Sequence, residues 1–274
     1  MNGITNHNSD ILYIEALFAI SILAFGLLLS VERIKPCRIY PNKIYKESIL
    51  TNTSAFLINN LILILIRASS LFMLAQQFSG LGLLSGLENG HLKWLLAFAC
   101  YDFGIYVWHY ASHKYEFLWR FHKVHHSDKS VNVSTGFRFH VFDLLLELLY
   151  KCVLIIVIGI NAYLALSFEI VELFFIFFHH ANISIPNEWL VSQVFITPSL
   201  HRPHHSTLRI EHDSDYGIVL SVWDKIFGTR KELTPESIGL ELIEASNFIQ
   251  LFSLAFITER EIRKLLNSNP REKK

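Results

Sequence analysis

The sequence predicts an all-α protein: a multi-pass membrane bundle of four to five transmembrane helices with a helical cap on the inner face. Of the 274 residues, 51% are hydrophobic and only 18% are charged, whereas a soluble domain usually carries about 25% charged residues. Four apolar regions approach or exceed the roughly 20 residues that one spanning helix requires. The 24 basic and 24 acidic residues balance, which argues against a nucleic-acid partner because phosphate binding needs a basic excess.

The four apolar regions give the expected order of the spans. They are residues 11–30, 54–75, 92–108 and 143–178. The first contains Glu15, the second Arg67 and the third Asp102. No basic residue precedes the first region and no small-residue cleavage site follows it, so it does not resemble a signal peptide. The fourth region has 36 residues, so we expect two helices joined by a tight turn near residues 159–161.

Lys and Arg residues alternate between the connections. None precedes residue 11, five lie in residues 31–53, none in 76–91 and five in 109–142. Because cytoplasmic loops are enriched in Lys and Arg, this pattern predicts an outside N-terminus, five spans and an inside C-terminus. The alternative has four spans, with residues 11–30 or the long hairpin lying only partly in the bilayer. The more polar chain after His180 is expected to fold on the cytoplasmic face.

Eight of the 14 histidines fall into three short clusters with helical spacing. In an α-helix, residues i, i+3 and i+4 lie on one face, so each cluster can direct its imidazoles at one point. Two predicted spans separate the second cluster from the third, and an even number of crossings returns the chain to the same side. We therefore expect all three clusters to meet. They are His109 and His113, then His122, His125 and His126, then His201, His204 and His205.

The number of clustered imidazoles indicates a metal site. One transition-metal ion takes four to six ligands, so eight imidazoles indicate two ions. The spacing does not choose between iron, zinc, copper and nickel. The soluble di-iron pattern requires repeated Glu-x-x-His motifs, and the sequence has one, at Glu88 and His91. A zincin protease is excluded because no His-Glu-x-x-His motif is present.

Further residues surround the clusters in a fixed order. They are Asp102, Tyr106 and Trp108, residues 178–182 (Phe-His-His-Ala-Asn), Thr197 and Pro198, residues 215–217 (Asp-Tyr-Gly), and Trp223, Asp224, Lys225, Phe227, Gly228 and Thr229. With these residues, positions 95–230 resemble the fatty acid hydroxylase/sterol desaturase superfamily of membrane di-iron enzymes. The resemblance covers half the chain and departs from the superfamily pattern at Tyr110, where Arg is usual.

The resemblance implies an activity and a domain organisation. It implies two iron ions, O2 as oxidant, and hydroxylation or desaturation at a C–H bond of a lipid such as a fatty acyl chain or a sterol. The chain would then comprise an N-terminal transmembrane region (1–92), a catalytic domain (93–230), and an inner-face C-terminal segment with a charged tail (231–274). The histidine-rich dimetal site would lie in the helical cap.

The resemblance also implies roles for individual residues. The metal ligands would be the eight clustered histidines and His180, and the catalytic residues would be Asp102, Tyr106 and Asn182. Asp102 lies on the same helical face as His109 and His113, so we expect its carboxylate to accept the non-ligating N–H of a metal-bound imidazole. The alternative is a helix-pairing contact with Arg67.

The remaining histidines leave alternatives open. His179 could accompany the ligand His180 or be a core residue. His140 could support the metal site or begin a helix. We expect His7, His91 and His212 to be ordinary surface residues.

Reductive O2 chemistry requires two external electrons per turnover, and the sequence shows no carrier for them. The glycine run at residues 80–86 misses the dinucleotide motif by one residue, and the three cysteines lie too far apart for an iron–sulfur cluster. We therefore expect a separate electron-donor protein and a lipid that enters from the bilayer. The alternatives are a histidine-lined metal transporter, whose ligands would lie near the bilayer midplane, and a metal-dependent membrane hydrolase.

The charge asymmetry generates a topological prediction. Reporter fusions at Asn2 and Lys274 should report opposite sides of the membrane, with the C-terminus cytoplasmic, because the Lys- and Arg-rich connections stay inside. Both ends on the same side would remove one span, most simply the first, without affecting the argument for a metal site.

Overall fold

The computed structural model describes residues 2–66, 69–241, 243–258 and 260–262. Within these ranges the regular structure is helical, and β-type pairing is limited to two isolated bridges, Phe195 with Leu220 and Ser206 with Ile238. The predicted all-α class is therefore confirmed. The longer helices are α1 (Asn2–Ile34), α2 (Asn42–Leu65), α3 (Ser69–Gln77), α4 (His91–Lys114), α5 (Glu116–His126), α6 (Val141–Ile158) and α7 (Ala162–His180).

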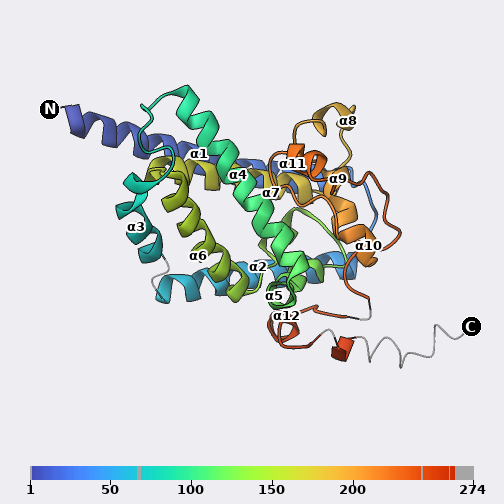
Figure 1. Ribbon diagram of the computed structural model, residues 1–274. Helices are drawn as coiled ribbons and strands as arrows, with labels where there is room; N and C mark the ends of the chain where they lie inside the picture. The colour runs from blue at the N-terminus through green and yellow to red at the C-terminus, as the bar shows by residue number, and fades with distance from the viewer. Residues whose placement is uncertain (1, 67–68, 242, 259, 263–274) are drawn as a thin grey trace, which may run out of the picture.

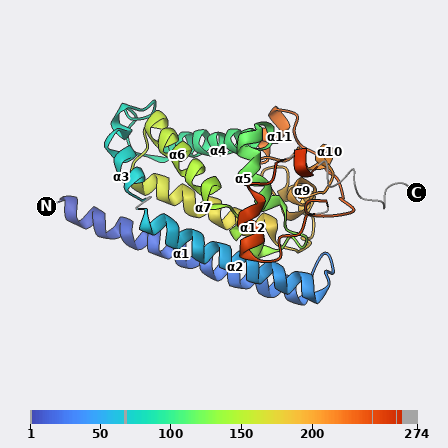
Figure 2. The same cartoon turned by 90° about the horizontal axis from the view of Figure 1, so that it is seen from below.

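The long helices form layers around α7. In Figure 2, α4 and α6 lie on one side of α7, and α1 and α2 lie on the other. α4, α6 and α7 enclose an apolar core that includes Tyr101, Ile105, Ile155 and Phe168. α1 packs along α7, and α3 packs on α6 (Figure 1). This arrangement places the C-terminal ends of α4 and α7, which carry histidines, close to α5.

The expected hairpin in residues 143–178 is confirmed. Gly159 ends α6 in the left-handed conformation, with φ 81°, which glycine adopts without the steric cost of a Cβ atom. Asn161 begins α7, and its side-chain oxygen accepts a hydrogen bond from the backbone N–H of Leu164 at 3.0 Å. Gly159, which ends α6, and Asn161, which begins α7, thus reverse the chain between the two helices.

Among the described residues, three helices are long and apolar enough to cross a membrane, which indicates an integral membrane protein. They are Glu15–Ile34, Asn42–Leu65 and Ala162–His180. The second predicted span is wrong in its bounds, because α2 ends at Leu65 and α3 begins separately at Ser69. The apolar run is interrupted there by Arg67, Ser69 and Ser70, and serine favours helix boundaries over helix interiors. The suggested contact between Asp102 and Arg67 lies outside the described residues.

α4 and α6 are not among these three helices, although both were predicted to span the membrane. α6 carries Asp143, Glu147 and Lys151 within 18 residues, and such side chains are costly in contact with lipid. The structure buries Asp143 and Lys151 against protein. The charged side chains of Asp143 and Lys151 therefore contact other protein groups, His122 and Glu172 among them.

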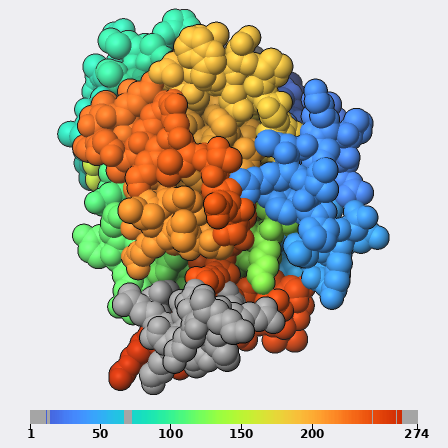
Figure 3. Space-filling view, turned by 90° about the vertical axis from the view of Figure 1, so that its right-hand side faces the viewer, coloured from blue at the N-terminus to red at the C-terminus, as the bar shows by residue number. Residues whose placement is uncertain are grey.

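Shorter helices and the loops between them make up the rest of the described chain. They are η1 (Ser79–Leu81), η2 (Val133–Phe137), α8 (Glu188–Val191), α9 (Pro198–His204), α10 (Arg209–His212), α11 (Val222–Ile226) and α12 (Phe248–Leu254). Figure 3 shows that the chain after α7, in gold and orange, covers one end of the molecule beside the connection between α1 and α2 in blue. We refer to this part of the chain, which contains the third histidine cluster, as the cap.

Glu32 ties the N-terminal helices to the cap region. Its carboxylate is buried in α1 and accepts hydrogen bonds from the Tyr45 hydroxyl at 2.9 Å and from the backbone N–H groups of Val133 and Asn182, each at 3.0 Å. The three donors come from α2, from η2 and from the segment after α7. One carboxylate thus fixes three separate parts of the chain.

We expect Glu32→Ala to lower the free energy of unfolding by at least about 3 kcal/mol, because each buried donor left without a partner costs about 1–3 kcal/mol. Tyr45→Phe is the matched control, since it removes only one of the three hydrogen bonds and should cost about 1 kcal/mol. The measurement is the Tm of the purified proteins in detergent. Equal losses of stability would show that the two backbone hydrogen bonds contribute nothing.

Candidate metal centre

Nine buried histidines gather into two groups in which all the offered nitrogen atoms lie within 4.8 Å of one another. The five-histidine group is His109, His113, His122, His126 and His204. The four-histidine group is His125, His180, His201 and His205. These are the eight clustered histidines and His180 of the sequence analysis, and no other residue type joins either group.

Helical spacing divides each His-x-x-His-His motif between the two groups. On α5, His122 and His126 are four residues apart and belong to the five-histidine group, whereas His125 joins the four-histidine group. Around α9 the pattern is complementary, because His201 and His205 join the four-histidine group and His204 joins the other. Residues i and i+4 lie nearly above one another on a helix, and the histidine at i+3 points in a neighbouring direction. Each motif therefore bridges the two groups.

The Nε2 atoms within the groups lie close together. His180 Nε2 is 3.0 Å from His125 Nε2, 3.1 Å from His201 Nε2 and 3.1 Å from His205 Nε2. In the five-histidine group, Nε2 atoms of His109 and His204 are 3.0 Å apart. Two nitrogens bound about 2.0–2.1 Å from one ion would lie roughly 2.9–3.4 Å apart for angles between 90° and tetrahedral. The spacing therefore fits donors that share an ion.

Backbone carbonyls hold three of the rings in one tautomer. The Nδ1–H groups of His109, His204 and His180 donate to the carbonyl oxygens of Tyr216 at 2.8 Å, Ser214 at 2.6 Å and Ile176 at 2.7 Å. Since a carbonyl oxygen can only accept, the proton lies on Nδ1 and the Nε2 lone pair is left for a metal. Such contacts fix both the tautomer and the orientation of a ligating ring.

Carboxylates lie next to two further rings. His122 Nδ1 donates to Asp143 Oδ2 at 3.1 Å. His113 Nδ1 lies 3.4 Å from Asp213 Oδ1, and neither of these two atoms has a hydrogen-bond partner among the described residues. A carboxylate behind an imidazole raises its basicity toward a metal. Sequence reasoning missed both aspartates, although the argument applied to Asp102, a carboxylate in an apolar region, applied equally to Asp143.

Several ring nitrogens remain without a hydrogen-bond partner among the described residues. They include both nitrogens of His126 and Nε2 of His113 and His122. Burial, followed by the neighbouring imidazoles, holds the pKa of His126, His204 and His205 well below the ordinary histidine value. Neutral imidazole is the form that binds metals, and a buried polar atom without a partner is costly. The donor set thus fits two transition-metal ions.

Asp102 does not act on a histidine, so the predicted contact with an imidazole is wrong. Its carboxylate accepts hydrogen bonds from the Trp223 indole N–H at 2.8 Å and from the backbone N–H of Leu220 at 3.3 Å. The carboxylate lies on the expected helical face, but it contacts the segment of residues 220–223 and not an imidazole. Asp102 therefore fixes the position of this segment.

Tyr106 and Asn182 likewise contact the chain around the histidines. The Tyr106 hydroxyl lies 3.0 Å from the Thr229 hydroxyl. The Asn182 side chain accepts from the backbone N–H of Arg38 at 2.9 Å and donates to its carbonyl at 2.7 Å. These contacts fasten the cap to α4 and to the connection after α1, which favours a positioning role over the predicted catalytic one.

Asp224 organises the loop that orients the histidines. Its carboxylate accepts from the backbone N–H groups of Tyr216 and Gly217 at 2.8 and 2.9 Å and from the Thr229 hydroxyl at 2.7 Å. The carbonyl of the same Tyr216 holds His109. The Asp-Tyr-Gly and Trp-Asp segments of the sequence therefore act through the backbone.

The other histidines have separate positions. His140 begins α6, where its Nδ1 accepts from the backbone N–H of Phe142 at 3.2 Å, so the helix-start alternative is confirmed. His212 is buried and not on the surface as predicted, and its Nδ1 donates to the carbonyl of Ser206 at 3.0 Å. His91 is exposed as expected, and the His7 side chain lies outside the described residues.

A cavity of about 40 Å³ connects the two histidine groups. Its apolar wall consists of Ile105, Trp108, Phe139, Ile176 and Ile218, and its polar wall includes histidines from both groups together with His179. A mainly apolar space next to two sets of metal donors is suited to a hydrocarbon segment and unfavourable for bulk water.

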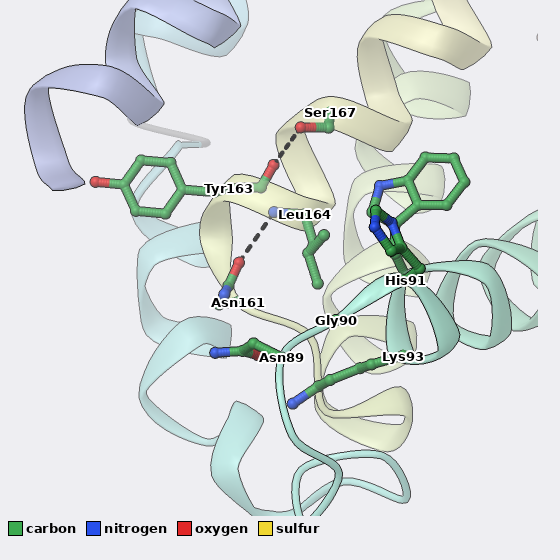
Figure 4. A pocket seen from close by; sticks show the side chains of 9 residues that line it. Asn89, Gly90, His91, Lys93, Asn161, Tyr163, Leu164 and Ser167 are labelled. Atoms are coloured by element: carbon green, nitrogen blue, oxygen red, sulfur yellow. Dashed lines mark hydrogen bonds between the residues drawn. The ribbon is translucent and has the colours of Figure 1, made fainter.

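A larger pocket of about 430 Å³ lies at the N-terminal ends of α4 and α7, whereas the histidines lie at their C-terminal ends (Figure 4). His91, Lys93 and Trp94 line it from α4, and Asn161 and Tyr163 line it from the start of α7. It contains none of the nine grouped histidines. Its greater volume therefore does not make it the reaction site.

Comparisons with known proteins show two lipid hydroxylases and related enzymes. The chain is 35% identical over 137 residues to alkylglycerol monooxygenase of Homo sapiens (50% of this chain, 30% of the relative). It is 30% identical over 174 residues to ornithine lipid hydroxylase of Rhizobium tropici (62% and 52%), and 28% identical over 142 residues to cholesterol 25-hydroxylase-like protein of Danio rerio (50% and 55%). The chain thus spans about a third to about half of the length of these relatives. No solved structure matches.

The fatty acid hydroxylase family model matches residues 94–229, about half of the chain. This match contains all three histidine clusters, His180, and the loop that orients His109 and His204. It also contains the cavity-lining residues of α4 and α7. The chain therefore belongs to the fatty acid hydroxylase/sterol desaturase superfamily.

Proposed function

We propose that the protein is a membrane-bound, non-haem di-iron oxidoreductase that uses O2 and external electrons to hydroxylate a C–H bond of a lipid. Desaturation of the same bond is the closest variant of this chemistry. The observation that carries the proposal is the convergence of nine buried imidazoles in two groups on one mainly apolar cavity. The human and Rhizobium tropici relatives are named as enzymes of alkylglycerols and ornithine lipids, which supports a lipid substrate.

Two iron ions held by the two histidine groups would supply the redox chemistry that O2 activation needs. The protein's own residues orient the imidazoles, through the carbonyls of Tyr216, Ser214 and Ile176 and the carboxylate of Asp143. The apolar wall of the cavity keeps water from the reacting carbon, which suppresses competing reactions. A histidine-lined transporter or a metal-dependent hydrolase would need no O2, so O2 consumption separates these alternatives from the proposal.

The electrons must come from outside the described chain. The free cysteines Cys37, Cys100 and Cys152 form no cluster, and each group of candidate metal ligands in the described residues contains histidine. A separate electron-donor protein is therefore proposed to dock on the cytoplasmic face, near the cap. The placement of the cap on this face rests on the Lys and Arg asymmetry of the sequence.

We expect two metal ions per chain in fully loaded protein, measured by elemental analysis of purified samples. His126→Ala and His180→Ala each remove a ligand from a different group, so each variant should lose about one ion while keeping the other. His140→Ala is the matched control, because His140 lies outside both groups. One ion or fewer in the loaded wild type would contradict the dimetal proposal, whichever metal is found.

We expect Asp143→Asn to lower metal affinity or activity by about 10-fold, because loss of a carboxylate behind a ligating histidine typically costs 10–100-fold. Asp102→Asn makes the same chemical change in a carboxylate that contacts Trp223 and Leu220. It should keep both metals at wild-type affinity and lower only the Tm. Metal titrations and thermal unfolding of both variants provide the measurement. A larger metal loss in Asp102→Asn than in Asp143→Asn would reverse these two assignments.

A further inference from the structure

A polar atom outside both histidine groups is buried at the cavity without a hydrogen-bond partner among the described residues. It is Nε2 of His179. The side chain of His179 lines the cavity between the two groups and is 1% exposed, and it belongs to neither group. A buried acceptor without a donor is costly, so a donor from a water or a ligand is expected at this position.

Two contacts hold the ring of His179. Its Nδ1 lies 3.3 Å from the carbonyl oxygen of Ile218, and because a carbonyl oxygen can only accept, Nδ1 carries the proton. The ring also packs against that of His201, with the two centroids 4.0 Å apart. Nε2 of His179 therefore presents a lone pair, and its partner must be an N–H or O–H donor.

The other ionisable lining residues outside the histidine groups form ion pairs. Glu147 Oε1 and Glu172 Oε2 lie 2.8 and 3.0 Å from Lys151 Nζ. The rest of the cavity wall consists of apolar and aromatic side chains and of the histidines that are proposed to bind metal. His179 thus differs from both sets, because it presents an uncharged acceptor.

We infer that His179 is a specificity-determining residue that accepts a hydrogen bond from the hydroxyl group of an alcohol-bearing lipid substrate. The inference rests on the proposed function, since it places the substrate in the cavity beside the proposed metal centre. An uncharged donor fits better than an ammonium group, because the cations in the two adjoining histidine groups would repel a further positive charge. A carboxylate or an ether has no proton to donate.

The size of the cavity limits where such a lipid is oxidised. At roughly 10–15 Å³ for each water-sized group, a cavity of about 40 Å³ holds about three non-hydrogen atoms. The hydroxyl oxygen and the reacting carbon must then lie within about three bonds of each other. Oxidation is therefore expected near the hydroxyl end of the chain and not at the distant methyl end.

The test compares dodecanol with dodecyl methyl ether, which keeps the oxygen but has no O–H donor. Binding to metal-loaded protein in phosphatidylcholine nanodiscs is measured without reductant, after subtraction of binding to protein-free nanodiscs. We expect the alcohol to bind at least about 10-fold more tightly, because a site with a buried acceptor discriminates against a ligand that leaves it unpaired. Equal binding of the two ligands, which is the result if a water satisfies Nε2, would overturn the inference.

His179→Phe keeps a planar ring but removes the acceptor, so it should reduce the preference for the alcohol to less than about 3-fold. His179→Gln can place an amide oxygen near the position of Nε2 and should restore part of the preference. Ile105→Val is the matched control, because it changes the wall of the same cavity without changing an acceptor. It should affect both ligands alike.

Elemental analysis of His179→Phe should find the metal content of the wild type. Loss of an ion from this variant, or an unchanged preference for the alcohol, would overturn the inference. With iron-loaded protein and a chemical reductant, product analysis should place the new hydroxyl within about three carbons of the first, and oxidation at the methyl end would overturn the placement. An alcohol preference that depends on His179, without O2 consumption, would instead reject the proposed function alone.

Discussion

The arrangement of nine buried imidazoles imposes the strongest constraint on this structure. Where two Nε2 atoms lie 3.0 Å apart with both lone pairs directed inward, they repel each other unless a proton or a metal lies between them. The proton positions set by Tyr216, Ser214 and Ile176 leave Nε2 of three rings bare. A positive centre in each group would remove this repulsion, and the surrounding hydrogen bonds then need only keep each ring in place.

Several polar residues near the groups contact the chain around the rings and not the rings themselves. Asp224 holds Tyr216 and Gly217, Asp102 holds Trp223 and Leu220, and Tyr106 contacts Thr229. All these contacts stabilise the loop of residues 214–229, whose carbonyls in turn orient His109 and His204. A motif residue can therefore stabilise the surroundings of a metal site without contacting any ligand, which is why the expected contact of Asp102 with an imidazole was wrong.

The local parts of the site could be predicted from the sequence, and the long-range parts could not. Spacings of three and four residues on α5 and around α9 determine which face each histidine occupies, so the division of these two clusters between the two groups follows from helix geometry, although each cluster was expected to point at one site. The contacts of His122 with Asp143 and of His113 with Asp213 join residues 21 and 100 positions apart in the chain, and no periodicity encodes them. The same limit applies to α6, where composition alone cannot tell that Lys151 is satisfied by carboxylates of α7.

α7 contributes both to the histidine groups, through His180, and to the carboxylates that contact Lys151, through Glu169 and Glu172. Glu172, Ile176 and His179 follow one another at intervals of four and three residues, so they share one face of the helix. The next residue, His180, belongs to the four-histidine group. At 1.5 Å per residue, Glu172 and His180 are about 12 Å apart along the axis.

Both ends of α7 are fixed. The turn at Gly159 and Asn161 sets the position of its first residues, and the backbone N–H of Asn182, just beyond its end, donates to Glu32. A rotation of α7 by one residue, about 100°, would displace the carboxylate and the imidazoles together. The position of Glu172 beside Lys151 and the geometry of the histidine groups are therefore not independent features of this fold.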